Sequence, residues 1–144
     1  MIVRLMKEED IPQIEEIEQR TFSQPWSAQG FLDALHNKNT IYLTVEENGE
    51  ILGYLGLWKS LEEADITNVA VKECVRRRGV ADLLLREAGK LARESGITAL
   101  TLEVRASNVA AVHLYEKHGF HSVGIRPNFY EKPKEDAIIM WAGK

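Results

Sequence analysis

The chain has 144 residues, which suits one domain, 1–144, with a core of its own. Its 18 basic and 22 acidic residues give a net charge of −4, which disfavours a protein that binds nucleic acid or membrane over a broad basic surface. The single cysteine, Cys74, excludes an internal disulfide framework and a multi-cysteine zinc site. No apolar run approaches the roughly 18 residues of a membrane span, and no signal peptide precedes Lys7. We expect a cytoplasmic protein.

The first half of the chain predicts two helices and four strands. Ile2–Met6 is expected to be a strand, and Asp10 to cap a helix with Pro12 in its first turn. A loop over Thr21–Trp26 leads to a second, short helix capped by Ser27. Further strands are expected at 41–45, 51–57 and about 64–71, the first two joined by a hairpin turn at Asn48-Gly49. We expect these strands to form an antiparallel meander.

The second half predicts a strand–helix–strand crossover. A helix is expected over 80–94 and ends at Gly96, and the alternation in 100–104 predicts a strand. Asn108 is expected to cap a helix that Gly119 stops, and 120–125 and 137–141 read as the last two strands. The fold class is therefore α+β, a mixed and mostly antiparallel twisted sheet of about 6–7 strands flanked by about four helices.

An anion-binding turn is predicted where a strand leads into the helix over 80–94. In Arg76-Arg-Arg-Gly-Val-Ala81, free backbone N–H groups and the helix dipole point at one spot, and Gly79 lets a phosphate approach the backbone. The arginines add charge-assisted hydrogen bonds. A diphosphate fits this turn, although the residues alone fit a solvated basic loop equally well. The pattern is neither a Walker loop nor Gly-x-Gly-x-x-Gly, and three arginines make too small a patch for nucleic acid.

The same residues resemble the phosphate loop of GNAT-type N-acetyltransferases, Arg/Gln-x-x-Gly-x-Gly/Ala. The block Leu102–Asn108 with Leu114-Tyr-Glu116, the segment Arg126-Pro-Asn-Phe-Tyr130, and Glu135–Met140 are similar to the ribosomal-protein alanine N-acetyltransferases, the RimI family. Pro25-Trp-Ser27 is similar too. The resemblance covers nearly the whole chain and implies a GNAT fold with acetyl-coenzyme A as cosubstrate and no metal. It also implies a protein N-terminus as acceptor, the N-terminal alanine of a small-subunit ribosomal protein.

The resemblance also implies roles for particular residues. Glu103 would be the general base and Tyr115 the general acid, and the loop around 126–130 would help to form the peptide site. The residues expected to bind acetyl-coenzyme A are Val69, Ala70, Val71, Arg76, Arg77, Arg78, Gly79, Val80, Ala81, Asp82 and Asn108. The residues expected to contact the peptide are Trp26, Arg126, Phe129 and Tyr130. Two departures bear on peptide specificity: Phe129 stands where a second tyrosine is frequent, and the linker 131–134 is short.

The residues also fit direct acetyl transfer without an acetyl-enzyme. A free α-amine has a pKa near 7.7–8.0, so one carboxylate can take its proton. Glu103 alternates with Leu102 and Val104 and so points to the opposite face of the sheet. A tyrosine hydroxyl suits the departing thiolate, and a backbone N–H of the strand around Val69–Val71 suits the carbonyl oxygen. Taken without the resemblance, Glu103 reads as a solvated glutamate and Tyr115 as a core aromatic.

Other functions remain open at the level of sequence. One alternative is a GNAT enzyme with broader peptide, lysine or small-amine substrates. Another is a non-catalytic sensor of acetyl-coenzyme A, although a sensor needs neither Glu103 nor Tyr115. Trp26 suits a wall of the peptide site or a loop anchor equally. Arg105 suits an acid of cofactor or substrate, or a neighbouring glutamate. Cys74 lacks a base beside it for a nucleophilic role.

Overall fold

The computed structural model describes residues 1–143 and contains seven strands, four α-helices and two short 3-10 helices. None of the helices in this range is long and apolar enough to cross a membrane. The elements, in chain order, are β1 (Ile2–Leu5), η1 (Glu8–Asp10), α1 (Ile11–Thr21), α2 (Ala28–Leu35), β2 (Thr40–Glu47), β3 (Glu50–Ser60), β4 (Glu63–Val71), η2 (Glu73–Val75), α3 (Val80–Glu94), β5 (Ala99–Arg105), α4 (Val109–Lys117), β6 (His121–Glu131) and β7 (Lys134–Gly143).

All strands join one mixed sheet in the order β1-β2-β3-β4-β5-β7-β6. Among the described strands, β4 and β5, which α3 connects, are parallel, and every other neighbouring pair is antiparallel. The predicted meander, the crossover and the α+β class are therefore confirmed. The turn between β2 and β3 is also as expected, since Asn48 and Gly49 both have positive φ, at 53° and 82°.

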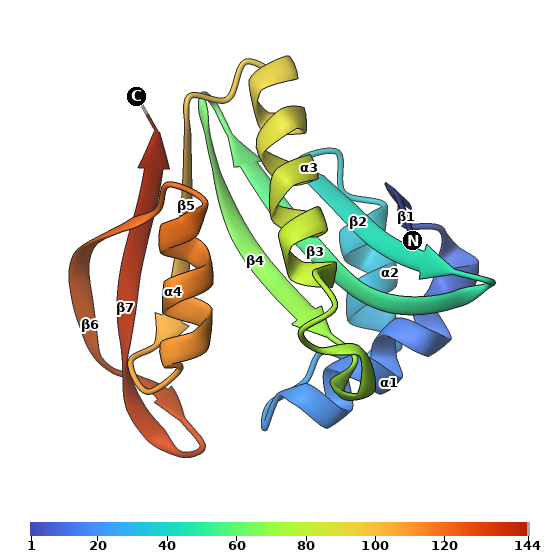
Figure 1. Ribbon diagram of the computed structural model, residues 1–144, viewed down its shortest axis with the longest axis horizontal. Helices are drawn as coiled ribbons and strands as arrows, with labels where there is room; N and C mark the ends of the chain where they lie inside the picture. Colours follow the sequence, from blue (N-terminus) through green and yellow to red (C-terminus); the bar gives the residue numbers. More distant parts are fainter. Residues whose placement is uncertain (144) are drawn as a thin grey trace.

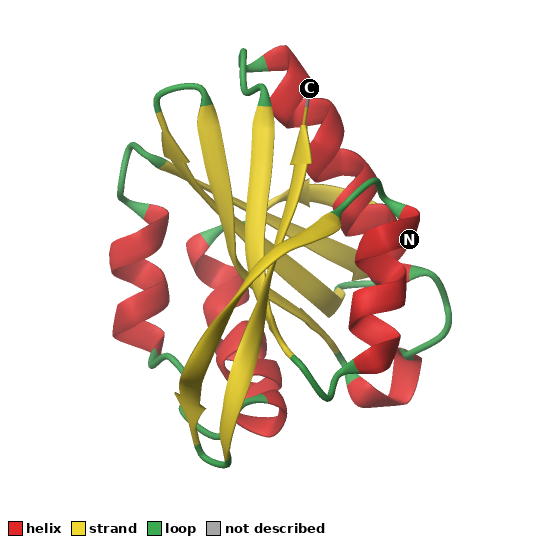
Figure 2. Cartoon of the chain, turned by 90° about the vertical axis from the view of Figure 1, so that its left-hand side faces the viewer, coloured by secondary structure: helices red, strands yellow, loops and turns green. Residues whose placement is uncertain are grey.

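Helices cover both faces of the sheet (Figure 2). On one face α1 and α2 pack against a cluster that includes Phe31, Tyr42 and Tyr54. On the other face α3 packs against the larger cluster, to which α4 contributes Tyr115. Because side chains alternate along a strand, neighbouring residues of β2 and β3 enter different clusters. The two larger buried clusters therefore hold the helices in place on either side of the sheet.

Most of the predicted helix ends are confirmed. Ser27 accepts a hydrogen bond from the N–H of Gly30 at 3.1 Å, and Asn108 accepts one from Ala111 at 3.2 Å. Gly96 and Gly119 follow α3 and α4 with positive φ. Asp10 does stand at the N-cap of α1, but its carboxylate makes no cap bond, because Arg4 and the N–H of Lys7 occupy it.

The prediction of a loop over 126–130 is wrong, because these residues belong to a strand. Strand β6 continues through these residues to Glu131, and the loop is replaced by a register shift between Arg126 and Tyr130. Asn128 adopts a positive φ of 53° there, and its N–H donates to the carboxylate of Asp136 at 2.8 Å. The irregularity is a bulge within a long hairpin, and the hairpin extends beyond the end of β5 (Figure 1).

Candidate active site

Strands β4 and β5 separate after a short stretch of pairing. Glu63–Asp65 pairs with Ala99–Thr101, and beyond these three residue pairs the strands diverge (Figure 1). The rest of β4, from Ile66 to Val71, pairs with β3 alone, apart from Thr67 at a register shift. The sheet is therefore open on one side of β4, next to the chain that leads to α3.

Two backbone N–H groups of β4 point into this opening. Lys72 donates its N–H to the carbonyl of Leu52 in β3 at 2.8 Å. Successive N–H groups of an antiparallel strand point alternately toward and away from the partner. Ala70 therefore also faces β3, whereas Val69 and Val71 direct their N–H groups to the side that β5 has left. This is the strand from which the sequence predicted a donor to a carbonyl oxygen.

The first turn of α3 presents further donors. Gly79 is the N-cap residue, with a φ of 83°, and no side chain caps the helix. The N–H groups of Val80, Ala81 and Asp82 have no acceptor within the helix. A Cβ atom built on Gly79 would meet no atom within 4 Å, so the space beside this backbone is open. The residues present therefore fit a diphosphate such as that of coenzyme A.

The three arginines before Gly79 have different surroundings. Arg78 pairs with Glu47 of β2, with Nη2 and Oε2 3.0 Å apart. Arg77 is exposed and has a positive φ of 69°. Arg76 lines a cavity on the side of α1. Glu47 thus partly neutralises the charge of Arg78 within the protein. The contacts of all three arginines with a cofactor stay a prediction.

Asp82 and Asn108 hold α3 and α4 in place. Asp82 lies 2.8 Å from Nε2 of His118 and 3.2 Å from Nζ of Lys117, both at the end of α4. The hydrogen bond from His118, opposed by partial burial and supported by Lys117, keeps the pKa of the Asp82 carboxyl below its usual value. Asn108 caps α4 through its Oδ1. The predicted cofactor contacts of both side chains remain predictions.

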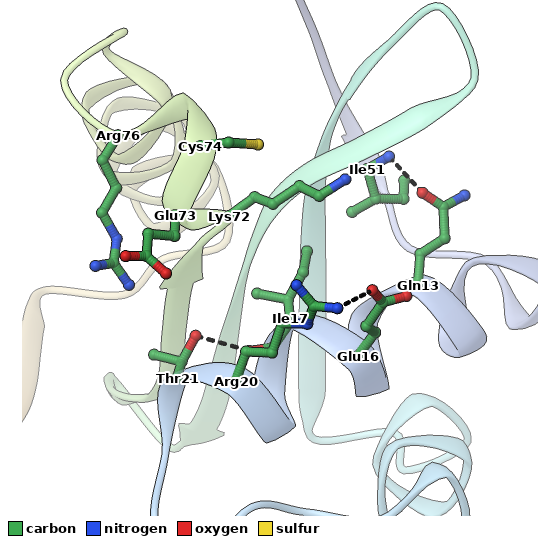
Figure 3. A pocket seen from close by; sticks show the side chains of 10 residues that line it. All are labelled: Gln13, Glu16, Ile17, Arg20, Thr21, Ile51, Lys72, Glu73, Cys74 and Arg76. Atoms are coloured by element: carbon green, nitrogen blue, oxygen red, sulfur yellow. Dashed lines mark hydrogen bonds and ion pairs between the residues drawn. The ribbon is translucent and has the colours of Figure 1, made fainter.

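A cavity of about 370 Å³ lies between α1 and the segment that follows β4 (Figure 3). Ile17 and Ile51 form its apolar part. Arg20, Lys72 and Arg76 bring positive charge to it, and Arg20 pairs with Glu16 at 3.2 Å. Neither Glu103 nor Tyr115 lines the cavity. The expected catalytic residues therefore lie outside it.

Glu103 stands on β5 where this strand has parted from β4. Its neighbours Leu102 and Val104 are buried in the larger core, whereas Glu103 is exposed, so the predicted alternation is confirmed. Its Oε2 lies 3.4 Å from Nε of Arg126 in β6. A carboxylate on this face, paired within residues 1–143 with an exposed arginine alone, is accessible to an incoming amine.

Tyr115 of α4 is buried, and its ring contacts that of Phe120 with the centroids 5.9 Å apart. Burial, with a smaller contribution from Tyr130, raises the pKa of its hydroxyl, which therefore stays protonated at neutral pH. The Tyr115 hydroxyl makes no hydrogen bond within residues 1–143. Every fully enclosed polar side-chain atom in this range does have a partner, so the Tyr115 oxygen is not among the enclosed atoms. The oxygen is therefore reachable by solvent or a ligand.

Tyr130 of β6 interacts electrostatically with both Glu103 and Tyr115. Burial raises the pKa of its hydroxyl, the charge of Glu103 raises it further, and Arg105 opposes the shift. The guanidinium of Arg105 sits 4.3 Å from the centre of the Tyr130 ring, a cation–π contact that fixes the ring. Phe129 packs edge-on against the same ring at 5.0 Å and is half exposed.

The loop between α1 and α2 is joined to the turn between β6 and β7. The hydroxyl of Ser23 donates to the carbonyl of Lys132. Arg105 donates to the same carbonyl at 3.2 Å and to that of Pro133 at 2.9 Å. Sequence reasoning did not find this connection, because no local pattern links residues 109 positions apart. Through Arg105 the connection also reaches the end of β5, and Trp26 lies three residues after Ser23.

The comparison with protein families decides the assignment. The profile described as "Acetyltransferase (GNAT) family" matches residues 11–120. The chain belongs to this family. The predicted GNAT fold, the acetyltransferase class and acetyl-coenzyme A as cosubstrate are confirmed with it.

Individual GNAT relatives are similar over nearly their whole length. The "[Ribosomal protein bS18]-alanine N-acetyltransferase" of Escherichia coli strain K12 is 38% identical over 135 residues, 91% of this chain and 89% of the relative. A Bacillus subtilis protein provisionally given the same name is 41% identical over 140 residues, 96% of this chain and 93% of the relative. The crystal structure of the Escherichia coli enzyme superposes with a TM-score of 0.91 at 33% identity, covering 99% of this chain and 92% of the other.

Proposed function

We propose that this protein transfers an acetyl group from acetyl-coenzyme A to the α-amine of a protein N-terminus, and that its substrate is the N-terminal alanine of ribosomal protein bS18. The relatives that carry this activity in their names support the substrate. The observation that carries the proposal is the joining of Ser23 to Lys132 beside Arg105, at the end of β5. This contact links the two segments that supply the proposed peptide-binding residues, and we place the end of the acceptor chain beside it.

Glu103 and Tyr115 divide the proton transfers between them. The α-amine of a peptide has a pKa of about 7.7–8.0, so a modest base suffices to make it nucleophilic. Glu103 accepts the amine proton on its exposed carboxylate. The hydroxyl of Tyr115, kept protonated by burial, donates toward the departing sulfur. The direct transfer needs no acetyl-enzyme, so Cys74 has no part in it.

The cosubstrate, when bound, supplies the acetyl group as a thioester. The N–H groups of Val80, Ala81 and Asp82 hold its diphosphate, and Arg76 and Arg77 add positive charge. The N–H groups of Val69 and Val71 face the opening and hydrogen-bond the pantetheine arm and the carbonyl oxygen. Fixed backbone donors of this kind stabilise developing negative charge because they need no reorientation during the reaction.

The acceptor peptide contacts residues from both sides of the site. Trp26 comes from the α1–α2 loop, and Arg126, Phe129 and Tyr130 come from β6. We place the reaction in the cytoplasm, where the exposed free thiol of Cys74 stays reduced. All described strands belong to one sheet, which supports a single domain over 1–144.

The test is acetyl transfer from labelled acetyl-coenzyme A to two synthetic peptides. One carries the bS18 N-terminus with its free alanine, and the other has a blocked N-terminus and a free lysine. We expect acetyl on the first peptide only, located on the α-nitrogen by mass spectrometry. Transfer to the lysine peptide at a comparable kcat/KM would replace the proposal with a broader amine specificity. Cofactor binding without transfer to either peptide would favour a sensor.

A further inference from the structure

Glu18 is a buried carboxylate that the proposed chemistry does not use. It is 3% exposed, and it stands one helical turn after Ile14 on the side of α1 that faces the sheet. Its Oε2 accepts the N–H of Trp26 at 3.0 Å, and its Oε1 accepts the hydroxyl of Tyr54. A buried carboxylate costs free energy that an apolar residue at this position would not. Both oxygens are nevertheless matched by donors, one of them in the α1–α2 loop.

Trp26, whose N–H donates this hydrogen bond, is held at its backbone and at its ring. The indole is 38% exposed and packs against Phe31 with the ring centres 5.4 Å apart. Phe31 is itself fixed edge-on against Tyr42 and Tyr54. Ser23 fixes the same loop to the β6–β7 turn. A large aromatic side chain that is exposed and yet fixed by such contacts is suited to receive a ligand at little cost of ordering.

We propose that Glu18 is a positioning residue for the acceptor peptide: by holding the backbone of Trp26 it fixes the indole as a wall for the first residues of the substrate. The inference rests on the proposed function, because it assumes an acceptor peptide beside the α1–α2 loop. Burial raises the pKa of the Glu18 carboxyl, and its two hydrogen bonds oppose that shift. Glu18 touches neither acetyl-coenzyme A nor the reacting amine, so its effect is on peptide binding.

The side-chain chemistry allows a pair of diagnostic variants. Glu18→Gln can keep both contacts, because its amide oxygen accepts from Trp26 while its NH2 group donates to the Tyr54 oxygen. Glu18→Leu fills a similar volume but removes the acceptor for Trp26. Losing a hydrogen bond to a charged acceptor predicts that Glu18→Leu raises the peptide KM about tenfold, with kcat and the KM for acetyl-coenzyme A within about threefold. Glu18→Gln should keep the peptide KM within about twofold of wild type.

A matched control separates positioning from general destabilisation. Ile14→Ala removes a fully buried side chain from the same helix, one turn away, and should lower Tm without moving the peptide KM. Trp26→Ala should raise the peptide KM as Glu18→Leu does, and the double variant should add nothing further. If Glu18→Leu fails to fold, Glu18→Ala is measured in its place.

The outcomes are distinguishable. The inference is overturned if the wild-type enzyme acetylates the alanine peptide and Glu18→Leu leaves the peptide KM unchanged. It is also overturned if Ile14→Ala raises that KM equally, or if Glu18→Gln behaves like Glu18→Leu. If the wild-type protein acetylates no peptide α-amine, the proposed function fails first, and a peptide-positioning role for Glu18 falls with it.

Discussion

Nε of Arg126 lies 3.4 Å from Oε2 of Glu103, so strand β6 supplies a counter-ion to the carboxylate that we propose as general base. The two side chains are 56% and 31% exposed, and solvent screens such a pair strongly. A substrate ammonium group can therefore take the place of Arg126 at little cost. We therefore expect the acceptor amine to replace Arg126 beside Glu103 when the peptide binds.

Glu103→Gln should lower kcat/KM for the alanine peptide by about 10²–10⁴-fold, because an amide of the same shape cannot accept the amine proton. The loss should be largest at acidic pH, where less of the amine is already neutral. The Kd for acetyl-coenzyme A should stay within about twofold of wild type. Glu94→Gln, an exposed glutamate at the end of α3, is the control and should retain full activity. A large loss of cofactor binding in Glu103→Gln would contradict the assignment as base.

Tyr115→Phe should lower kcat by about 10²-fold while leaving the fold intact. The ring keeps its contact with Phe120, and no hydrogen bond within residues 1–143 is lost, so Tm should hardly change. Tyr42→Phe is the contrasting variant, because its hydroxyl donates to Asn68 at 3.0 Å in the core. It should cost about 1–3 kcal/mol of unfolding free energy. A wild-type rate in Tyr115→Phe would remove Tyr115 from the mechanism.

Gly79→Trp should abolish binding of acetyl-coenzyme A, measured by calorimetry, because the indole occupies the open space beside the first turn of α3. Gly96→Trp is the matched control, since Gly96 also has a positive φ and no atom within 4 Å of a built Cβ. Both variants carry the same backbone strain of about 1–2 kcal/mol. Only Gly79→Trp should lose the cofactor, and equal binding by the two proteins would refute the diphosphate site.

The stability of the protein should depend on pH through Glu18. Burial raises the pKa of this carboxyl above its ordinary 4.5 despite the hydrogen bonds from Trp26 and Tyr54, so the native state binds the proton more tightly than the unfolded state. Unfolding then releases a proton, and the unfolding free energy falls as pH rises from about 4.5 through the native pKa. Glu18→Gln carries no charge at either pH, so its Tm minus that of wild type should be larger at pH 7 than at pH 4. An equal difference at both pH values would contradict the shift.

Features that depend on a few neighbouring residues were predicted well from the sequence. The caps at Ser27 and Asn108, the hairpin at Asn48-Gly49 and the glycine turn before α3 each need only local chemistry. The extension of β6 was missed because Pro127 and Asn128 suggest a loop, whereas pairing with β7 continues on both sides of them. Tertiary pairing here overrides the local preference.

The parts of the site that depend on distant contacts were not predictable in the same way. The bond of Ser23 to Lys132 and the stacking of Arg105 on Tyr130 join segments far apart in the chain. Glu18 did leave a signal, because it follows Ile11 and Ile14 at helical spacing and so puts a carboxylate on the apolar face of α1. A charged residue in that stripe predicts a buried partner, although the sequence does not say which one.

The early separation of β4 from β5 has a consequence for amide hydrogen exchange. At the end of β4 and in the residue after it, the amides of Ala70 and Lys72 point to β3, while those of Val69 and Val71 face the opening. Adjacent residues should therefore alternate between slow and fast deuterium uptake in the free protein. Acetyl-coenzyme A should erase that alternation by slowing Val69 and Val71, so that two amide signals report occupancy of the site without any measurement of turnover.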